Sequence, residues 1–455
     1  MNVLLVNPPS SGIFKTVGFQ LPPLSLLYPA AYLEAHSYPV TIKDFCIEGK
    51  IDKNFDFSQY PVVGITTDTT RYPSALKIAH MAKKSGCFVV MGGPHTQFAY
   101  EEVLNTNLVD CIVDGEGEVT FCELVGHVRK GNDIGEVKGI SFKRNGRIVK
   151  TAPREAIQDL NKLPLPARHL INMNAYYITK LGDRPITSIV TSRGCPSNCS
   201  FCSSSKFFGT KWRWRSVPSI MEELEEIYFK YNFRAVAFVD DNFTTNPQRV
   251  IELAEEIMRR KLDIWWWNFS RIDTLAKNEE MIRTMARAGA KTIYTGIESV
   301  NPDTLKEFRK QITPSMAITA VNMLKKHNFN IFASYILGGL SDTVKSINET
   351  IKFSINLDTN VAQYTILTPY PGTEVYNQVK EKIFNKKHGA YDGQHLVFKH
   401  QNISSVRMHW LLLKANFLFY TRSKKAICDL LYVLKRQRVF PTSIIKFIKH
   451  MILNA

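Results

Sequence analysis

The chain has 455 residues, of which 44% are hydrophobic and 22% charged, enough for two or three domains with sizeable cores. Its eight cysteines are too few for a disulfide framework in so long a chain, and no run of about 18 uncharged apolar residues is present to span a membrane. The formal net charge is +17 at pH 7, and because the first residues lack the basic region of a signal peptide, we expect a cytoplasmic protein.

Residues 1–135 alternate between short apolar runs and segments with helical periodicity. This alternation predicts a doubly wound parallel sheet with helices on both faces, that is, an α/β domain of the Rossmann-like kind. Ligands of such sheets bind beyond the carboxyl ends of the strands. The loops expected at that edge are residues 7–10, 66–72, 92–96 and 114–118.

Residues 136–180 are expected to form a hairpin and a linker between two larger units. The hairpin turns at Asn145-Gly146, a pair that favours a tight turn between antiparallel strands. The linker contains Leu163-Pro164-Leu165-Pro166, and proline at this density is typical of irregular structure.

Strand–helix alternation begins again in residues 181–375. Six strand-like runs are each followed by a helix-like segment or a glycine- or proline-rich turn, which predicts a partial (β/α)6 barrel. The expected strands are residues 186–191, 235–239, 263–268, 292–296, 331–337 and 361–367. Chemistry in barrels of this kind takes place at the carboxyl ends of the strands.

Residues 376–455 are expected to form a basic helical region, since Lys380 to Ala455 contain fifteen basic residues against three acidic ones. The segments 406–420 and 424–438 are amphipathic and could either pack on the core or lie on an anionic membrane surface. The absence of a recognisable RNA-binding string argues against a nucleic acid partner. We therefore expect a cytoplasmic protein that can associate peripherally with a membrane.

Three cysteines, Cys195, Cys199 and Cys202, follow the first strand of the expected barrel with the spacing Cys-x3-Cys-x2-Cys. Three thiolates so close together can hold three irons of a cubane cluster and leave the fourth iron open to a small molecule. The alternative is zinc, which normally takes four ligands in two pairs, and no second pair follows within reach. The motif therefore predicts an iron–sulfur redox enzyme.

The cysteine motif after the first strand of an incomplete barrel, preceded by a doubly wound domain, resembles the cobalamin-binding branch of the radical S-adenosylmethionine superfamily. That branch includes cobalamin-dependent methylases and the anaerobic magnesium-protoporphyrin IX monomethyl ester cyclase. The resemblance covers about residues 1–375. It implies a 4Fe–4S cluster on the three cysteines, S-adenosylmethionine on the open iron, bound cobalamin, and a low-potential electron donor of the flavodoxin or ferredoxin type.

The resemblance also implies a set of residues that bind S-adenosylmethionine. Phe201 lies between the second and third cysteines, where the family has an aromatic residue beside the adenine. Arg271 is the candidate for the carboxylate, because a guanidinium matches that group with two parallel hydrogen bonds. The remaining candidates follow strands: Asp241, Glu298 and Ser299. A cap or turn role is the alternative for each polar residue.

The cobalamin site is expected in the loops of the first domain, at Thr67, Thr70, Gly92, Gly93, His95, Glu116 and Gly117. Family members with a histidine ligand to cobalt carry an Asp-x-His-x-x-Gly string, which this chain lacks. His95 is therefore expected at the edge of the cofactor rather than on cobalt. The group below the cobalt is left open, with residues 67–72 as the place to look.

The predicted function is methylation of an unactivated carbon of an unknown substrate after reductive cleavage of S-adenosylmethionine. The sequence leaves open radical oxidation, cyclisation or carbon–carbon bond formation without methyl transfer, for example on a tetrapyrrole or a lipid. A non-catalytic cobalamin- or metal-responsive protein is a third hypothesis, against which the open cluster argues. No catalytic side chain is predicted beyond the cluster ligands.

Overall fold

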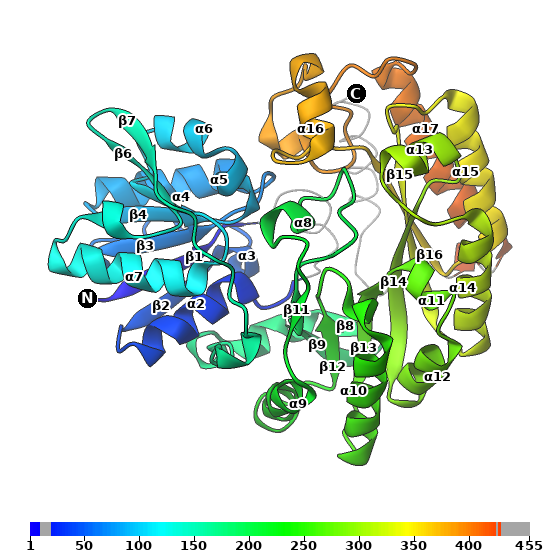
Figure 1. Cartoon of the computed structure of the whole chain (residues 1–455), viewed down its shortest axis with the longest axis horizontal. Helices are drawn as coiled ribbons and strands as arrows, with labels where there is room; N and C mark the ends of the chain where they lie inside the picture. The colour runs from blue at the N-terminus through cyan, green and yellow to red at the C-terminus, as the bar shows by residue number, and fades with distance from the viewer. Residues whose placement is uncertain (10–19, 425, 429–455) are drawn as a thin grey trace.

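A computed structural model of the chain describes residues 1–9, 20–424 and 426–428. Two seven-stranded sheets lie beside each other, the first in the N-terminal part and the second in the barrel (Figure 1). The first sheet has the order β2-β1-β3-β4-β5-β6-β7. Its strands are β1 (Val3–Asn7), β2 (Val40–Asp44), β3 (Val62–Thr66), β4 (Phe88–Gly92), β5 (Cys111–Val113), β6 (Ile140–Arg144) and β7 (Arg147–Lys150).

The first five strands are parallel, and helices cover both faces of the sheet. α2 (Leu24–Ala35) and α7 (Gly117–Lys130) pack on one face with Leu5 and Val90, and α4 (Tyr72–Lys84) and α6 (Tyr100–Asn105) pack on the other with Leu4 and Val63. The alternation along each strand, which sends successive side chains to opposite faces, builds both cores. The predicted doubly wound domain is confirmed.

The hairpin expected between the two units forms with its turn at Asn145-Gly146, and it belongs to the first sheet. β6 pairs with β5 in antiparallel register, and β7 pairs with β6 to form the edge. Antiparallel strands need only a short connection, so the hairpin extends the parallel sheet without another crossover helix.

The second sheet has the order β16-β15-β14-β13-β12-β9-β8, and only β8 is antiparallel to its neighbour. β16 and β8 do not pair, so the sheet curls into a half-barrel that stays open. Six parallel strands confirm the predicted partial barrel. Its strands are β8 (Lys180–Leu181), β9 (Arg184–Ile189), β12 (Ala235–Phe238), β13 (Trp265–Ser270), β14 (Ala290–Glu298), β15 (Asn330–Leu337) and β16 (Val361–Ile366).

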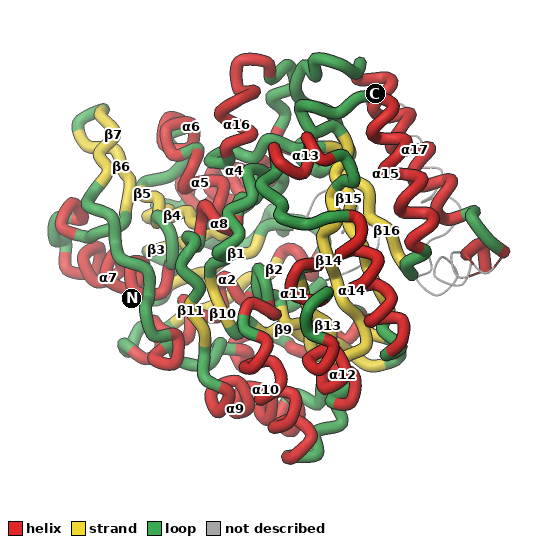
Figure 2. The backbone as a smooth tube through the Cα atoms, turned by 45° about the vertical axis from the view of Figure 1, so that its right-hand side comes forward, coloured by secondary structure: helices red, strands yellow, loops and turns green. Residues whose placement is uncertain are grey.

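Helices cover the outer side of the half-barrel. α10 (Pro247–Arg259) shows why: Asn246 caps its first turn, proline stands at its first position, and Val250, Leu253 and Ile257 recur at helical spacing on its buried face. α14 (Pro314–Lys326) and α15 (Val344–Leu357) flank β14 to β16 in both views (Figures 1 and 2).

The C-terminal region begins with α16 (Glu374–Val379), and α17 (Ser405–Tyr420) then packs on the barrel. One face of α17 is buried, including Met408, Leu412 and Phe419, which confirms core packing for that face, whereas Trp410 and Phe417 are exposed. Most of the amphipathic segment 424–438 lies outside the described residues. Among the helices that are described, none is long and apolar enough to cross a membrane.

A buried ion pair anchors the linker between the two sheets. Arg168 is fully buried; its Nη2 lies 2.7 Å from Oε1 of Glu223 on α9 (Val217–Glu225) and donates to the Ser188 carbonyl of β9 at 2.6 Å. Glu223 is also fully buried and pairs with Arg215. A carboxylate in this position is tolerated only because two guanidinium groups surround it.

We expect Glu223→Gln to lower the free energy of unfolding by about 3–5 kcal/mol, because it leaves Arg168 and Arg215 with an uncompensated charge in the interior. Chemical denaturation followed by circular dichroism measures the change. Glu226→Gln is the matched control, since it removes a pair with the largely exposed Lys230 in the next turn. Equal effects of the two substitutions would contradict the prediction.

Candidate functional site

The cysteine motif lies in the loop that follows β9 and β10 (Ser192–Arg193) and precedes α8 (Ser204–Phe207). β10 pairs with β11 (Arg213–Trp214), which closes the loop at its base. Gly194 has a φ of +85°, and a Cβ there would lie 2.4 Å from the Lys211 carbonyl oxygen. The Cys195 amide donates to the Gly209 carbonyl at 3.2 Å. Only glycine permits this close packing, which fixes the start of the cluster loop.

The three thiols are free, with Cys199 buried and Cys195 and Cys202 partly exposed. A tetrahedral zinc site holds its sulfurs about 3.8 Å apart, given Zn–S bonds near 2.3 Å. Within the described chain, the three sulfurs do not form a group of ligand atoms within 4.8 Å of one another. The three sulfurs are thus not gathered around a single point, an arrangement compatible with a cluster of several irons.

Two cations face the cluster loop. Nη1 of Arg271 lies 3.8 Å from the Cys199 sulfur. Burial raises the pKa of the Cys199 thiol, while Lys310 and Arg271 act in the opposite direction. Thiolate ligands and an anionic cluster are stabilised by this positive charge.

The residues predicted for S-adenosylmethionine lie around this loop. The Arg271 guanidinium is held by Asp273 at 2.8 Å, and Glu298, at a φ of +64°, pairs with Lys310 at 2.9 Å. The structure therefore brings Arg271 and the Lys310–Glu298 pair to the cluster loop.

Phe201 and Ser299 are engaged within the protein. The Phe201 ring meets Phe308 edge to face at 4.9 Å between centroids. The Ser299 hydroxyl accepts from the Asn301 amide at 3.1 Å and lies 3.4 Å from the Thr350 hydroxyl. The turn role that the sequence left open for Ser299 is thus present, and it leaves contact with a cofactor untested.

The two aspartates that follow β12, Asp240 and Asp241, lie in different surroundings. Asp240 accepts hydrogen bonds from the Thr191 amide and from the hydroxyls of Thr191 and Ser192, so it ties β12 to the base of the cluster loop. Asp241 lines a cavity, and burial raises its pKa to about 6. A buried carboxyl with a raised pKa at a cavity wall is a candidate for contact with a ligand.

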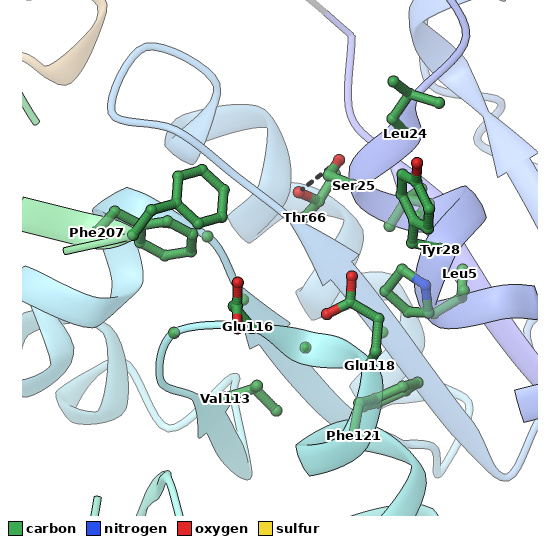
Figure 3. Close-up of a pocket in the computed structure, with 18 of the residues that line it drawn as sticks. Leu5, Leu24, Ser25, Tyr28, Thr66, Val113, Glu116, Glu118, Phe121 and Phe207 are labelled. Carbon is green, nitrogen blue, oxygen red and sulfur yellow. Dashed lines mark hydrogen bonds between the residues drawn. The ribbon is translucent and has the colours of Figure 1, made fainter. Parts of the chain in front are cut away.

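The cavity has a volume of about 220 Å³ and lies between the two sheets. Side chains from both halves of the chain surround it: Phe207 on one side, Leu5 and Tyr28 on the other (Figure 3). Four of the residues predicted for cobalamin line it: Gly92, Gly93, Glu116 and Gly117. Ser192 and Arg193 also line it, so the wall of the cavity continues directly into Cys195.

Thr67, Thr70 and His95 are not among the residues that line the cavity. Gly93 has a φ of +116°, and a Cβ there would lie 2.3 Å from the Thr67 carbonyl oxygen, so the two loops are in close contact. The Thr70 hydroxyl donates to Asp68 at 2.7 Å. His95 is 1% exposed and packs on Tyr72.

A buried network of charges connects the cavity to the cluster loop, and the sequence analysis did not find it. Arg193 pairs with Glu118 at 2.5 Å and with Glu116 at 3.1 Å, and Arg213 pairs with Glu116 at 2.9 Å. All four side chains are buried. The neighbouring acids raise the pKa of Arg193 against the opposing effect of burial. The sequence shows an arginine two residues before Cys195 and two glutamates after a strand. No sequence pattern indicates that these residues are in contact.

Comparison with known proteins gives consistent matches. The family model described as the radical SAM superfamily matches residues 189–354, and the one described as the B12 binding domain matches residues 10–125. An uncharacterized methyltransferase of Pyrococcus horikoshii is 38% identical over 453 residues, covering 96% of this chain and 97% of the relative.

Two further matches cover most of the chain. The anaerobic magnesium-protoporphyrin IX monomethyl ester cyclase of a Synechocystis species is 25% identical, covering 93% of this chain and 86% of the relative. The solved structure of TsrM from Kitasatospora setae, a radical S-adenosylmethionine methyltransferase with cobalamin and a 4Fe–4S cluster bound, superposes with a TM-score of 0.71. It covers 84% of this chain and 78% of TsrM at 18% identity, so it shows the same fold.

We expect the Arg193–Glu118 pair to be energetically coupled. In a double-mutant cycle of Arg193→Met and Glu118→Gln, each single variant leaves a buried charge or amide unpaired, so the coupling energy should be about 1–3 kcal/mol. Chemical denaturation of the four proteins measures it. The exposed pair Arg283 and Glu280 is the control, and its cycle should show no coupling. A coupling near zero at Arg193 would contradict the prediction.

Proposed function

Since this chain belongs to the cobalamin-binding branch of the radical SAM superfamily, we propose that it methylates an unactivated carbon of a substrate yet to be identified. The two domain matches confirm the cofactor set predicted from the sequence: a 4Fe–4S cluster, S-adenosylmethionine and cobalamin. When bound, the cluster supplies the electron that cleaves S-adenosylmethionine, and cobalamin supplies the methyl group.

The observation that carries the proposal is the shared wall between the cavity and the cluster loop. Arg193 lines the cavity, holds Glu116 and Glu118 of the first domain, and precedes Cys195 by two residues. Two reacting groups held in one fixed arrangement react far faster than the same groups free in solution. This arrangement supports a transfer between two cofactors bound side by side.

Side chains of the cluster loop and the barrel would bind the cluster and S-adenosylmethionine. Cys195, Cys199 and Cys202 would hold the cluster. Arg271 would bind the carboxylate of S-adenosylmethionine, because its guanidinium already lies beside the Cys199 sulfur. We propose that Phe201, Asp241, Glu298 and Ser299 contact the same ligand.

Cobalamin would be held by the cavity, whose lining includes Leu5, Gly64 and Val90. At about 220 Å³ the cavity is smaller than the usual site of a drug-sized ligand, so it suits an aromatic part of the cofactor rather than the whole molecule. Gly92, Gly93, Glu116 and Gly117 would line that contact. Contacts of Thr67, Thr70 and His95 with the cofactor stay predictions.

The alternative is radical oxidation or cyclisation without methyl transfer, and similarity to the cyclase supports it at 25% identity. The methyltransferase relative is 38% identical and covers more of both chains, which favours methyl transfer. A reductant is required in either case, and we propose a flavodoxin or ferredoxin. A cytoplasmic location and the membrane-surface role of residues 424–438 stay predictions.

The test is product analysis. Protein reconstituted anaerobically with iron, sulfide and hydroxocobalamin should convert S-adenosylmethionine under reductant into both 5′-deoxyadenosine and S-adenosylhomocysteine, detected by mass spectrometry. Cys199→Ala should lose both products, and its bound iron should fall from about four per chain to below about one. Cys428→Ser is the control, since that thiol is exposed and far along the chain, and it should change nothing.

The outcomes separate the candidate functions. 5′-Deoxyadenosine without S-adenosylhomocysteine would favour oxidation or cyclisation. Neither product, from protein that holds both cofactors and is supplied with reductant, would contradict an enzymatic role.

We expect Gly92→Val to weaken hydroxocobalamin binding about tenfold or more, because the added side chain would project into the cavity. A Cβ at this position has its nearest neighbours at Val113, 3.9 Å away, so the Cβ itself fits without a clash. Gly92→Ala adds only that Cβ and should cause a smaller loss. Absorbance titration measures both affinities, and unchanged binding by Gly92→Val would place the cofactor elsewhere.

A further inference from the structure

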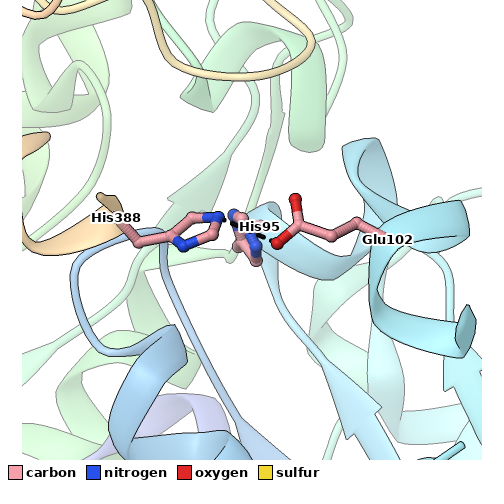
Figure 4. A group of neighbouring side chains, drawn as sticks. All are labelled: His95, Glu102 and His388. Carbon is pink, nitrogen blue, oxygen red and sulfur yellow. Dashed lines mark ion pairs between the residues drawn. The ribbon is translucent and has the colours of Figure 1, made fainter. Parts of the chain in front are cut away.

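Three side chains from distant parts of the chain lie close together. One of them belongs to the helix that follows the cavity-lining strand β4. His95 lies on α5 (Pro94–Phe98), Glu102 on α6, and His388 in the short turn η8 (His388–Ala390) of the C-terminal region. One ligand atom from each lies within 4.8 Å of the other two (Figure 4). Among the described residues, this is the one group of three or more histidine, cysteine, aspartate or glutamate side chains that is so close.

One polar atom of the buried His95 side chain is unsatisfied. Its side chain is 1% exposed, and Nδ1 lies 3.3 Å from the Thr69 hydroxyl. Nε2 is buried and has no hydrogen-bond partner in the described part of the chain. When Nδ1 donates to Thr69, Nε2 carries the free lone pair, which is the arrangement of a metal-bound histidine. A buried polar atom without a partner calls for an explanation, and a metal ion provides one.

His388 and Glu102 complete the donor set. Nε2 of His388 lies 3.0 Å from Oε1 of Glu102. Tyr72 packs against both imidazoles, with ring centroids 4.3 Å from His95 and 4.9 Å from His388. The Tyr72 ring therefore fixes the two histidines next to each other and keeps one side of the group apolar.

We propose that His95, Glu102 and His388 bind a divalent metal ion, zinc, that is separate from the iron–sulfur cluster. Two histidines and one carboxylate form a donor set that holds zinc with a fourth position open to water. Ligand atoms around one tetrahedral zinc lie about 3.4 Å apart, so closure of the group requires side-chain shifts of about 1 Å. Glu102 is exposed and His388 is partly exposed, so these two side chains have room to move.

The ion would link the first domain to the C-terminal region. On one side it binds His95, which follows Gly93 of the cavity wall. His95 in turn lies within hydrogen-bond distance of Thr69, in the loop after β3. On the other side it binds the C-terminal region that follows the barrel. A metal bound by segments so distant in sequence stabilises the folded state, because the unfolded chain does not assemble the site.

The test measures zinc rather than activity. Cluster-reconstituted holoenzyme is incubated with zinc chloride, passed over a chelating resin, and analysed by mass spectrometry for zinc and iron. We expect about one zinc per chain. His388→Ala and Glu102→Gln should each lower the retained zinc at least about fivefold and leave the iron unchanged, since both side chains are at least partly exposed and their loss should not prevent folding. The matched control is His80→Ala, an exposed histidine on α4.

A second variant separates this site from the cysteine motif, whose thiols can also bind zinc when iron is absent. The triple substitution of Cys195, Cys199 and Cys202 by alanine should lose the iron and keep the zinc. Added zinc should raise the thermal unfolding midpoint of the wild-type holoenzyme and leave that of His388→Ala unchanged. Zinc retention that survives His388→Ala and Glu102→Gln would overturn the proposal, as would the absence of retained zinc or a ferrous ion bound there in its place.

Discussion

The position of the cavity relative to the cluster loop depends on the buried contact of Arg193 with Glu116 and Glu118. Taking these charges out of water is costly, and the cost is offset only while every partner is present. Arg213 balances the second glutamate charge, so two cations meet two anions. The network therefore fixes the position of the first domain relative to the barrel, because a shift between them would leave a buried charge unpaired. The start of α7 and the start of the cluster loop are thus held in one register.

A second buried group reinforces this register at the base of the cavity. Arg215 pairs with Glu223 and donates to the hydroxyl of Tyr28, a cavity residue on α2, at 3.3 Å. Glu223 in turn pairs with Arg168 of the linker. The linker and the barrel are therefore joined by ion pairs, and the first domain is joined to them by the Tyr28 hydroxyl. Apolar contacts alone would specify this geometry less strictly, because they tolerate sliding.

Local patterns in the sequence predicted most of the fold and the cluster. Strand and helix periodicity is set by neighbours within a few residues, and the three cysteine ligands lie within one loop, so both could be read directly. The charge network could not, because Arg193 and Glu118 are 75 residues apart and single charges carry no periodic signal. His95 shows the same limit: its contacts with Tyr72 and His388 come from elements that only the folded chain brings together.

The electrostatics around Cys199 follow the same logic on a smaller scale. Arg271 and Lys310 both face the thiol, and each also has a carboxylate partner, Asp273 and Glu298. The cations are thus held in place beside the thiol, each oriented by its own carboxylate. Such preorganisation costs no rearrangement at the moment of reaction. Methyl transfer through cofactors requires little acid or base chemistry from side chains, so the protein's main contribution is to hold the cofactors at a fixed separation. Buried ion pairs, which are strictly directional, serve that purpose better than a flexible hinge between two domains would.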